Sequence, residues 1–264
     1  MAFQIIVVSL AAEIKRKIKN KNYTMRKNVL LLVLFFAALN LAQAQVWLEL
    51  GAKGMMGMTG LANANINGDA DHDSSLGFAT SLGGVANLNF GDYHGLTFEM
   101  LGATYSHSMT YRGAAGNRTI NMEWESIDAY LLYRFFRSNG AFAELGGKAT
   151  YLRGAQQSFG TDWSDVSGKY TDRYWSGCFG VGGFVTANKV LTVKTGIRAE
   201  YAFTDLMSAE GQAENYPTFY TNYDTYEETR PFRIGFYMEV TFGVGGIAQS
   251  QCGARGVIFG TGYN

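Results

Sequence analysis

The chain has 264 residues and carries equal numbers of basic and acidic side chains, 22 of each. It contains 33 glycines and only two prolines, a composition that suits long paired strands joined by tight corners. Its two cysteines, Cys178 and Cys252, are too few for a disulfide framework.

The segment before residue 45 predicts export rather than part of the fold. A basic start at Met25 leads into the apolar run 29–39, and Ala42 and Ala44 have the spacing of a cleavage site after small residues. The apolar run is shorter than the roughly 20 residues that a membrane-spanning helix needs. We therefore interpret residues 25–44 as a signal peptide rather than a membrane anchor.

Residues 1–24 precede a complete signal sequence, and we interpret them as a mis-assigned start or an extension. Removing residues 1–44 takes away seven basic residues and one acidic residue, which leaves 15 bases and 21 acids. Nucleic acid binding needs a basic surface, so the negative mature chain argues against a nucleic acid partner.

From Val46 onward, apolar and polar residues alternate in segment after segment, which is the period of a strand with two different faces. In the last segment, apolar residues occupy one parity, whereas Arg233 and Glu239 lie on the other. An apolar outer face and a polar inner face are typical of a barrel in lipid. We predict eight strands, at about residues 46–56, 76–90, 96–105, 126–135, 143–151, 174–186, 191–204 and 231–242.

The predicted connections run long, short, medium, short, long, short, long, and the medium one contains a predicted loop at residues 112–119. Bacterial outer-membrane barrels have an even number of strands, short periplasmic turns and longer external loops. A soluble β-sandwich gives no reason for such alternation, nor for charges at the centre of nearly every strand. The sequence therefore predicts an all-β fold. It is a transmembrane up-and-down antiparallel barrel of eight strands over residues 45–242, with a cleaved signal peptide before it and a Gly-rich tail, 243–264, after it.

Charged side chains of both signs fall on the inward parity of the predicted strands. An eight-stranded barrel is only wide enough inside for side chains to fill, and buried charges need partners. We therefore predict a filled, charge-paired lumen rather than a general porin. The predicted lumen charges are Glu49, Lys53, Glu99, Asp128, Arg134, Glu144, Lys148, Lys194, Arg198, Glu200, Arg233 and Glu239.

The longest predicted loop, 206–230, concentrates aromatic residues among acidic ones. Tyrosine-rich external surface is favoured at protein contacts, because the ring is amphipathic and loses little entropy. The alternative is a loop that packs over the barrel mouth, and the sequence leaves both open. The candidate contact residues are Tyr216, Phe219, Tyr220, Tyr223 and Tyr226.

Two further patterns resemble parts of known functional sites. Asp69, Asp71 and Asp73 alternate as at the start of a calcium loop, but Ser74 and Thr80 stand where that motif needs Gly and Glu. We interpret these acids as solvated loop residues, with a weak external Ca²⁺ site as the alternative.

His107 is the histidine nearest the predicted outer rim, with Glu123 or Glu125 across the next link. It has no partner at motif spacing, so we interpret it as a lumen histidine rather than a catalytic base. We predict no catalytic residues, no cofactor and no metal.

The chain resembles the small eight-stranded outer-membrane barrels of the OmpA/OmpX type. It is also similar to the Bacteroidetes outer-membrane β-barrel group, which includes PorT-like proteins. The similarity lies in the start at Met25-Arg-Lys, the Leu-Ala-Gln-Ala-Gln stretch that ends at Gln45, and the Gly-rich strands. The resemblance covers about Val46 to Phe242. Members usually end on a terminal aromatic residue; here Phe242 would take that place, although residues 243–264 follow.

The resemblance implies an integral protein of the cell outer membrane, but such barrels serve adhesion, secretion, lipid chemistry or envelope integrity. We expect a structural or interaction protein that acts through its external loops, or an accessory of an envelope or secretion complex. Its partners would be outer-membrane lipid and a protein bound at the external loops or the periplasmic side. An enzyme acting on lipid A or peptides, and a narrow channel, are the alternatives.

Overall fold

The computed structural model describes residues 46–113, 116–187, 191–218 and 223–244. The contacts between Cα atoms divide the chain after Gln45, and the described residues all belong to the unit that follows. The predicted extension 1–24, the predicted signal peptide 25–44 and all but the first two residues of the predicted tail lie outside the described residues.

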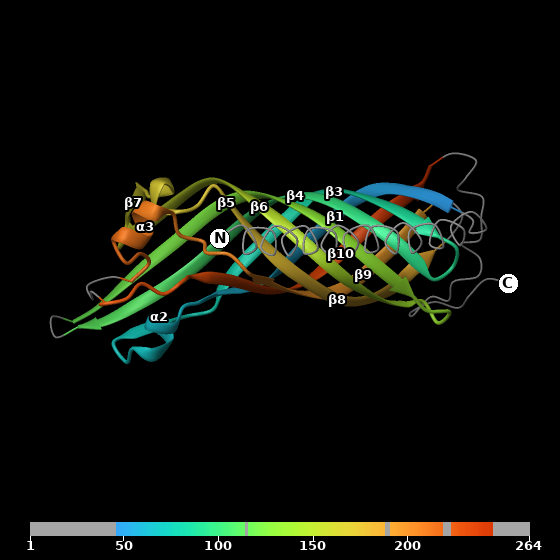
Figure 1. Ribbon diagram of the computed structural model, residues 1–264. Helices are drawn as coiled ribbons and strands as arrows, with labels where there is room; N and C mark the ends of the chain where they lie inside the picture. The colour runs from blue at the N-terminus through green and yellow to red at the C-terminus, as the bar shows by residue number, and fades with distance from the viewer. Residues whose placement is uncertain (1–45, 114–115, 188–190, 219–222, 245–264) are drawn as a thin grey trace, which may run out of the picture. The chain divides into compact units, whose positions relative to one another are not determined.

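Eight long strands form a closed ring, each antiparallel to its two neighbours (Figure 1). Each pairs with the next along the chain, and the last pairs with the first to close the barrel. This confirms the predicted up-and-down antiparallel barrel. The strands are β1 (Val46–Ala62), β3 (Gly77–Phe90), β4 (His94–Gly113), β5 (Gly116–Phe136), β6 (Ala141–Phe159), β8 (Arg173–Ala187), β9 (Leu191–Ala202) and β10 (Arg230–Gly243).

The two ends of the barrel differ in their connections. At one end, tight turns join β3 to β4 and β5 to β6, and Gly91 and Gly140 adopt positive φ angles of 57° and 83° there, which glycine does without strain. The other end carries the short elements, which are α2 (Ala64–Gly68), β2 (His72–Ser74), β7 (Asp162–Asp165), the 3₁₀ helix η1 (Ser167–Lys169) and α3 (Ala209–Ala213). We call the two ends the turn end and the loop end. Within the described residues, the helices are too short and too polar to cross a membrane.

One predicted loop is wrong. Residues 112–119 were expected as a loop, but β4 and β5 stay paired out to Arg112 with Asn117 and Gly113 with Gly116. The Thr110 and Thr119 hydroxyls hydrogen-bond across this pair at 3.0 Å. Glycine and asparagine suggested a loop, whereas they form the tip of a long two-stranded arm. The first strand is also longer than predicted and runs to Ala62.

The outer face of the barrel is apolar. Leu82 is 70% exposed, and Leu145 and Met100 are almost as open. Tyr133 and Phe135 face outward near the turn end, and Tyr151 and Tyr201 do so toward the loop end. A continuous apolar surface of this kind is unfavourable in water but suits hydrocarbon, and aromatic residues at its edges suit the membrane interfaces.

Inside, apolar clusters lie among the charged residues. Phe136, Phe142 and Phe184, near the turn end, pack with Met55 and Tyr237. Toward the loop end, a larger cluster includes Tyr105 and Trp124, whose rings stack 5.3 Å apart. Residues from the loops, including Leu206 and Tyr216, join that cluster. The loops thus pack into the mouth of the barrel.

Candidate functional site

All twelve predicted lumen charges are buried inside the barrel, each no more than 4% exposed. They separate into two groups along the barrel. The inner network joins eight of them: Glu49, Lys53, Glu99, Arg134, Glu144, Lys194, Arg198 and Glu239. The outer cluster holds the other four: Asp128, Lys148, Glu200 and Arg233. Each group contains as many acids as bases.

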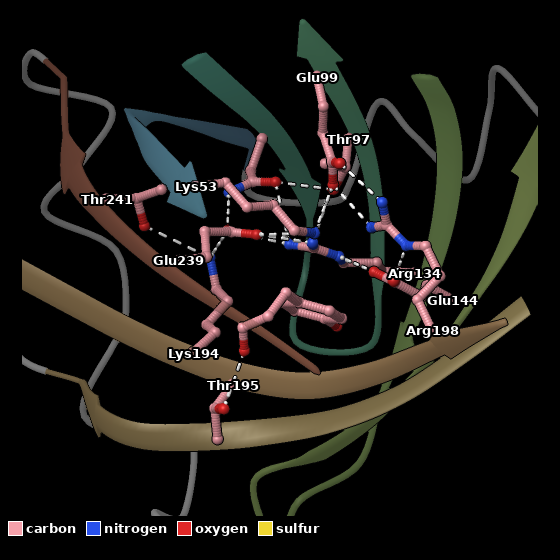
Figure 2. Close-up of polar contacts among 12 residues, drawn as sticks. Lys53, Thr97, Glu99, Arg134, Glu144, Lys194, Thr195, Arg198, Glu239 and Thr241 are labelled. Atoms are coloured by element: carbon pink, nitrogen blue, oxygen red, sulfur yellow. Dashed lines mark hydrogen bonds and ion pairs between the residues drawn. The ribbon is translucent and has the colours of Figure 1, made fainter. Parts of the chain in front are cut away.

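Two arginines form the centre of the inner network (Figure 2). Arg134 on β5 donates to Glu144 at 3.0 Å and to Glu239 at 2.7 Å. Arg198 on β9 donates to the other oxygen of Glu144 at 2.7 Å and makes a two-pronged bond to Glu99, each leg 2.8 Å. Planar guanidinium groups can satisfy several carboxylate oxygens at once, so they suit a dry, crowded lumen.

Two lysines extend this network toward β1. The Lys53 ammonium lies 2.6 Å from Glu99 and 3.7 Å from the centre of the Tyr237 ring. Lys194 on β9 donates to Glu49 at 2.6 Å and to Glu239 at 3.0 Å. Strands far apart in the sequence are thereby joined through the lumen.

Two uncharged residues that stabilise or accommodate this network were not predicted from the sequence. Asn87 donates to Glu239 at 2.7 Å and accepts from Arg134, although only charged inward positions were singled out. Gly180 on β8 makes room for the Glu144 side chain, because a Cβ at this position would lie only 2.7 Å from a Glu144 carboxylate oxygen. The Gly-rich sequence of β8 therefore leaves room for its neighbours' charged side chains.

The outer cluster is held by tyrosines. Lys148 donates to Glu200 at 2.7 Å and lies 3.6 Å from Asp128. The Tyr105 hydroxyl donates to Asp128 at 2.6 Å, and the Tyr130 hydroxyl donates to Glu200 at 3.0 Å. Both carboxylates are thus stabilised although they are out of water.

Arg233 differs from the other lumen bases because no carboxylate lies within ion-pair distance of it among the described residues. Its Nη2 donates to the Met55 carbonyl and to the Ser81 hydroxyl, each at 3.2 Å. Its Nε and Nη1 are buried without a partner, beside a cavity of about 10 Å³ that Tyr174 also lines. That volume is enough for about one water molecule.

The tyrosines of the predicted contact loop pack against the rim. Tyr216 is buried, and its hydroxyl bonds to the Gln157 side chain. The Tyr226 hydroxyl donates to Asp205 at 2.6 Å, while burial and this bond raise the pKa of Tyr226. Phe219 and Tyr220 lie outside the described residues. The described part of the loop thus packs over the barrel mouth.

Two of the three aspartates in the first loop have separate protein partners. Asp69 accepts a hydrogen bond from the Tyr223 hydroxyl and lies 2.8 Å from His72 Nδ1, so it ties the first loop to the last. Asp73 instead pairs with Arg112 at 2.7 Å. Among the described residues, no group of three or more His, Cys, Asp or Glu side chains could hold a metal ion.

The tie at Asp69 predicts a pH effect. The hydrogen bond from Tyr223, the Asp71 amide and His72 lower the pKa of Asp69 from 3.8 to about 2. A carboxylate whose pKa is lowered by folding contributes stability above its unfolded pKa, and that contribution is lost as pH falls from about 4 toward 2. In the wild type, the amides of α2 should therefore lose protection from hydrogen exchange as pH falls through this range. Asp69→Asn should abolish this pH-dependent loss of protection. Asp71→Asn should retain the wild-type pH profile; an unchanged profile in Asp69→Asn would contradict the assignment.

His107 has a partner that the sequence did not suggest. Its Nε2 lies 3.0 Å from the Ser74 hydroxyl. It faces the interior and is 1% exposed, whereas Glu123 and Glu125 face outward on β5. Its Nδ1 has no partner, so an acid that would orient the ring is missing among the described residues. Serine and histidine here form a buried structural contact rather than a complete catalytic triad.

Together, the closed ring of eight strands, the apolar outer face and the charged interior define a transmembrane β-barrel of the outer-membrane type. No protein-family model matches the sequence. The curated proteins contain no significant match either.

Among solved structures, the chain is similar to the outer membrane protein OprG from Pseudomonas aeruginosa, with 11% identity, a TM-score of 0.39, and 75% of this chain and 95% of that one covered. It is also similar to Neisserial surface protein A, with 12% identity, a TM-score of 0.40, and coverage of 73% and 96%. A third is Ail of Yersinia pestis, with 9% identity, a TM-score of 0.35, and coverage of 74% and 98%.

Proposed function

We propose that the protein is an integral outer-membrane barrel that acts as a structural or interaction protein, with its loop end outside the cell. The observation that carries this proposal is the filled lumen: ion-paired side chains cross the interior, and the loops pack into one mouth. A barrel plugged in this way does its work at its surfaces. This supports an interaction role over a channel.

Which end faces outward can be tested by labelling in cells. With Cys178 and Cys252 replaced by Ser, single cysteines would be introduced at Asp224 in the last loop and at Asp92 in a turn. A membrane-impermeant maleimide should label intact cells at position 224 and should label position 92 only after the outer membrane is broken. The reverse pattern would contradict the orientation.

The interaction role can be tested by affinity purification from native membranes. Asp224 and Glu227 are exposed, and neither side chain makes a hydrogen bond or ion pair within the described residues, so replacing both with Arg should leave the barrel folded. We expect this variant to lose a protein that co-purifies with the wild type, whereas Asp92→Arg retains it. Loss only with Asp92→Arg would instead support an accessory role on the periplasmic side. Steady conductance in planar bilayers would support the channel alternative.

A further inference from the structure

A hollow of about 400 Å³ lies on the outer side of β5 and β6 at the loop end, above the apolar belt. Glu123 and Glu125 of β5 line one side of the hollow, and Arg153 to Gln156 of β6 lie next to them. On the side opposite β5, the hollow is bounded by η1 and by Trp163 and Asp165 of β7. The hollow is distinct from the lumen charges and from the Tyr-rich loop.

The backbone explains why a hollow forms here. The pairing of β5 with β6 shifts between Glu125 and Ser126, so Arg153 is an extra residue in β6, a β-bulge. Gly154, opposite Glu125, has no side chain to fill the surface. A Cβ at Gly154 would meet only the Ser167 hydroxyl, at 3.9 Å, so the glycine is not required by crowding.

The polar side chains around the hollow are not engaged with one another. Within the described residues, Glu123, Glu125, Arg153 and Gln156 make no side-chain hydrogen bond or ion pair, although their positions are adjacent. The Trp163 indole is 48% exposed beside them. Donors and acceptors held apart around an open aromatic face are the features of a small-ligand site.

The charges select the class of ligand. Three carboxylates surround the hollow, so a phosphate or sulfate would be repelled. Arg153 lies among them, and an ammonium, which could pair with the carboxylates, has no acceptor to offer the guanidinium. A neutral polyol both donates and accepts hydrogen bonds, and the C–H face of a pyranose ring can stack on an indole.

We propose that this hollow is a binding site for a neutral oligosaccharide, in which Trp163 stacks on a sugar ring while Glu123, Glu125, Arg153 and Gln156 bind its hydroxyls. The site goes beyond the proposed function, and its binding does not depend on which end of the barrel faces out.

The test uses the full mature barrel in lauryldimethylamine oxide micelles, because detergents with sugar head groups would compete. Saturation-transfer NMR would be recorded with maltotriose, triacetylchitotriose and xylotriose, and with trilysine and inorganic phosphate. We expect saturation transfer to at least one trisaccharide and none to trilysine or phosphate. No transfer to any trisaccharide, or binding of trilysine or phosphate in their place, would overturn the proposal.

Variants locate the site. Gly154→Phe fills the hollow and Trp163→Ala removes its aromatic wall, and each should weaken trisaccharide binding at least tenfold. Trp175→Ala removes an equally exposed tryptophan on β8, and Glu227→Gln removes an exposed acid at the same end; both should bind as the wild type does. The shift of the folded band in unheated gels checks folding. Wild-type binding by a folded Gly154→Phe variant would place the sugar elsewhere and refute the proposal.

Discussion

Replacing Arg134 with Met should destabilise the barrel by about 3–5 kcal/mol, the usual effect of removing one partner from a buried ion pair. Arg134 contacts Glu144 and Glu239, and both carboxylates are buried, so loss of the guanidinium leaves buried negative charge without its partner. Urea unfolding in lipid vesicles measures the change. Arg137→Met, in an exposed turn three residues away, is the matched control and should change the free energy of unfolding by less than about 0.5 kcal/mol.

A second variant separates the ion pair from a simple loss of packing. Arg134→Met leaves the inner network with three bases and four acids, and adding Glu239→Gln restores equal numbers. The double variant should therefore be more stable than the sum of the two single effects predicts. Additive effects, or a loss below about 1 kcal/mol for Arg134→Met, would contradict a lumen held by charge pairing.

Replacing Leu82 with Arg should cost about 2–4 kcal/mol in lipid vesicles, because an arginine on the lipid face near the membrane centre must leave water. Leu82 lies near the middle of β3, faces outward and is the most exposed large apolar residue of the described chain. In a water-soluble barrel the same change at so open a position would cost almost nothing. The measurement is again unfolding by urea in vesicles.

The control for Leu82→Arg is Asp224→Arg, an exposed loop position outside the apolar belt, which should leave stability within about 0.5 kcal/mol. Equal, small effects of the two substitutions would contradict the placement of the belt in lipid.

The period-two pattern was enough to predict the eight strands and, in all but the Gly-rich strand at 174–186, which side faces inward, because a closed barrel has only two faces. It could not show which lumen charges meet. Glu49 and Lys194, for example, are 145 residues apart in the sequence, and their contact depends on how β1 and β9 are aligned in the closed barrel. Arg233 was expected in a balanced set, yet its guanidinium bonds to a carbonyl and a hydroxyl instead.

The loop end was less predictable for a different reason. The contacts of Asp69 with Tyr223 and of His107 with Ser74 join separate loops or a loop with a strand, and no local pattern encodes them. The hollow beside Trp163 depends on a bulge in β6 and on the pairing of β7, both of which appear only when the strands are aligned.

The inner network also has a consequence for how the barrel assembles. Glu49 belongs to the first strand, whereas Lys194 belongs to β9, so their contact forms only when β10 meets β1. An open sheet that entered hydrocarbon early would carry unpaired charges on one face. Closure and insertion should therefore be concerted, and intermediates that lack the final seam should be too costly to accumulate in the membrane.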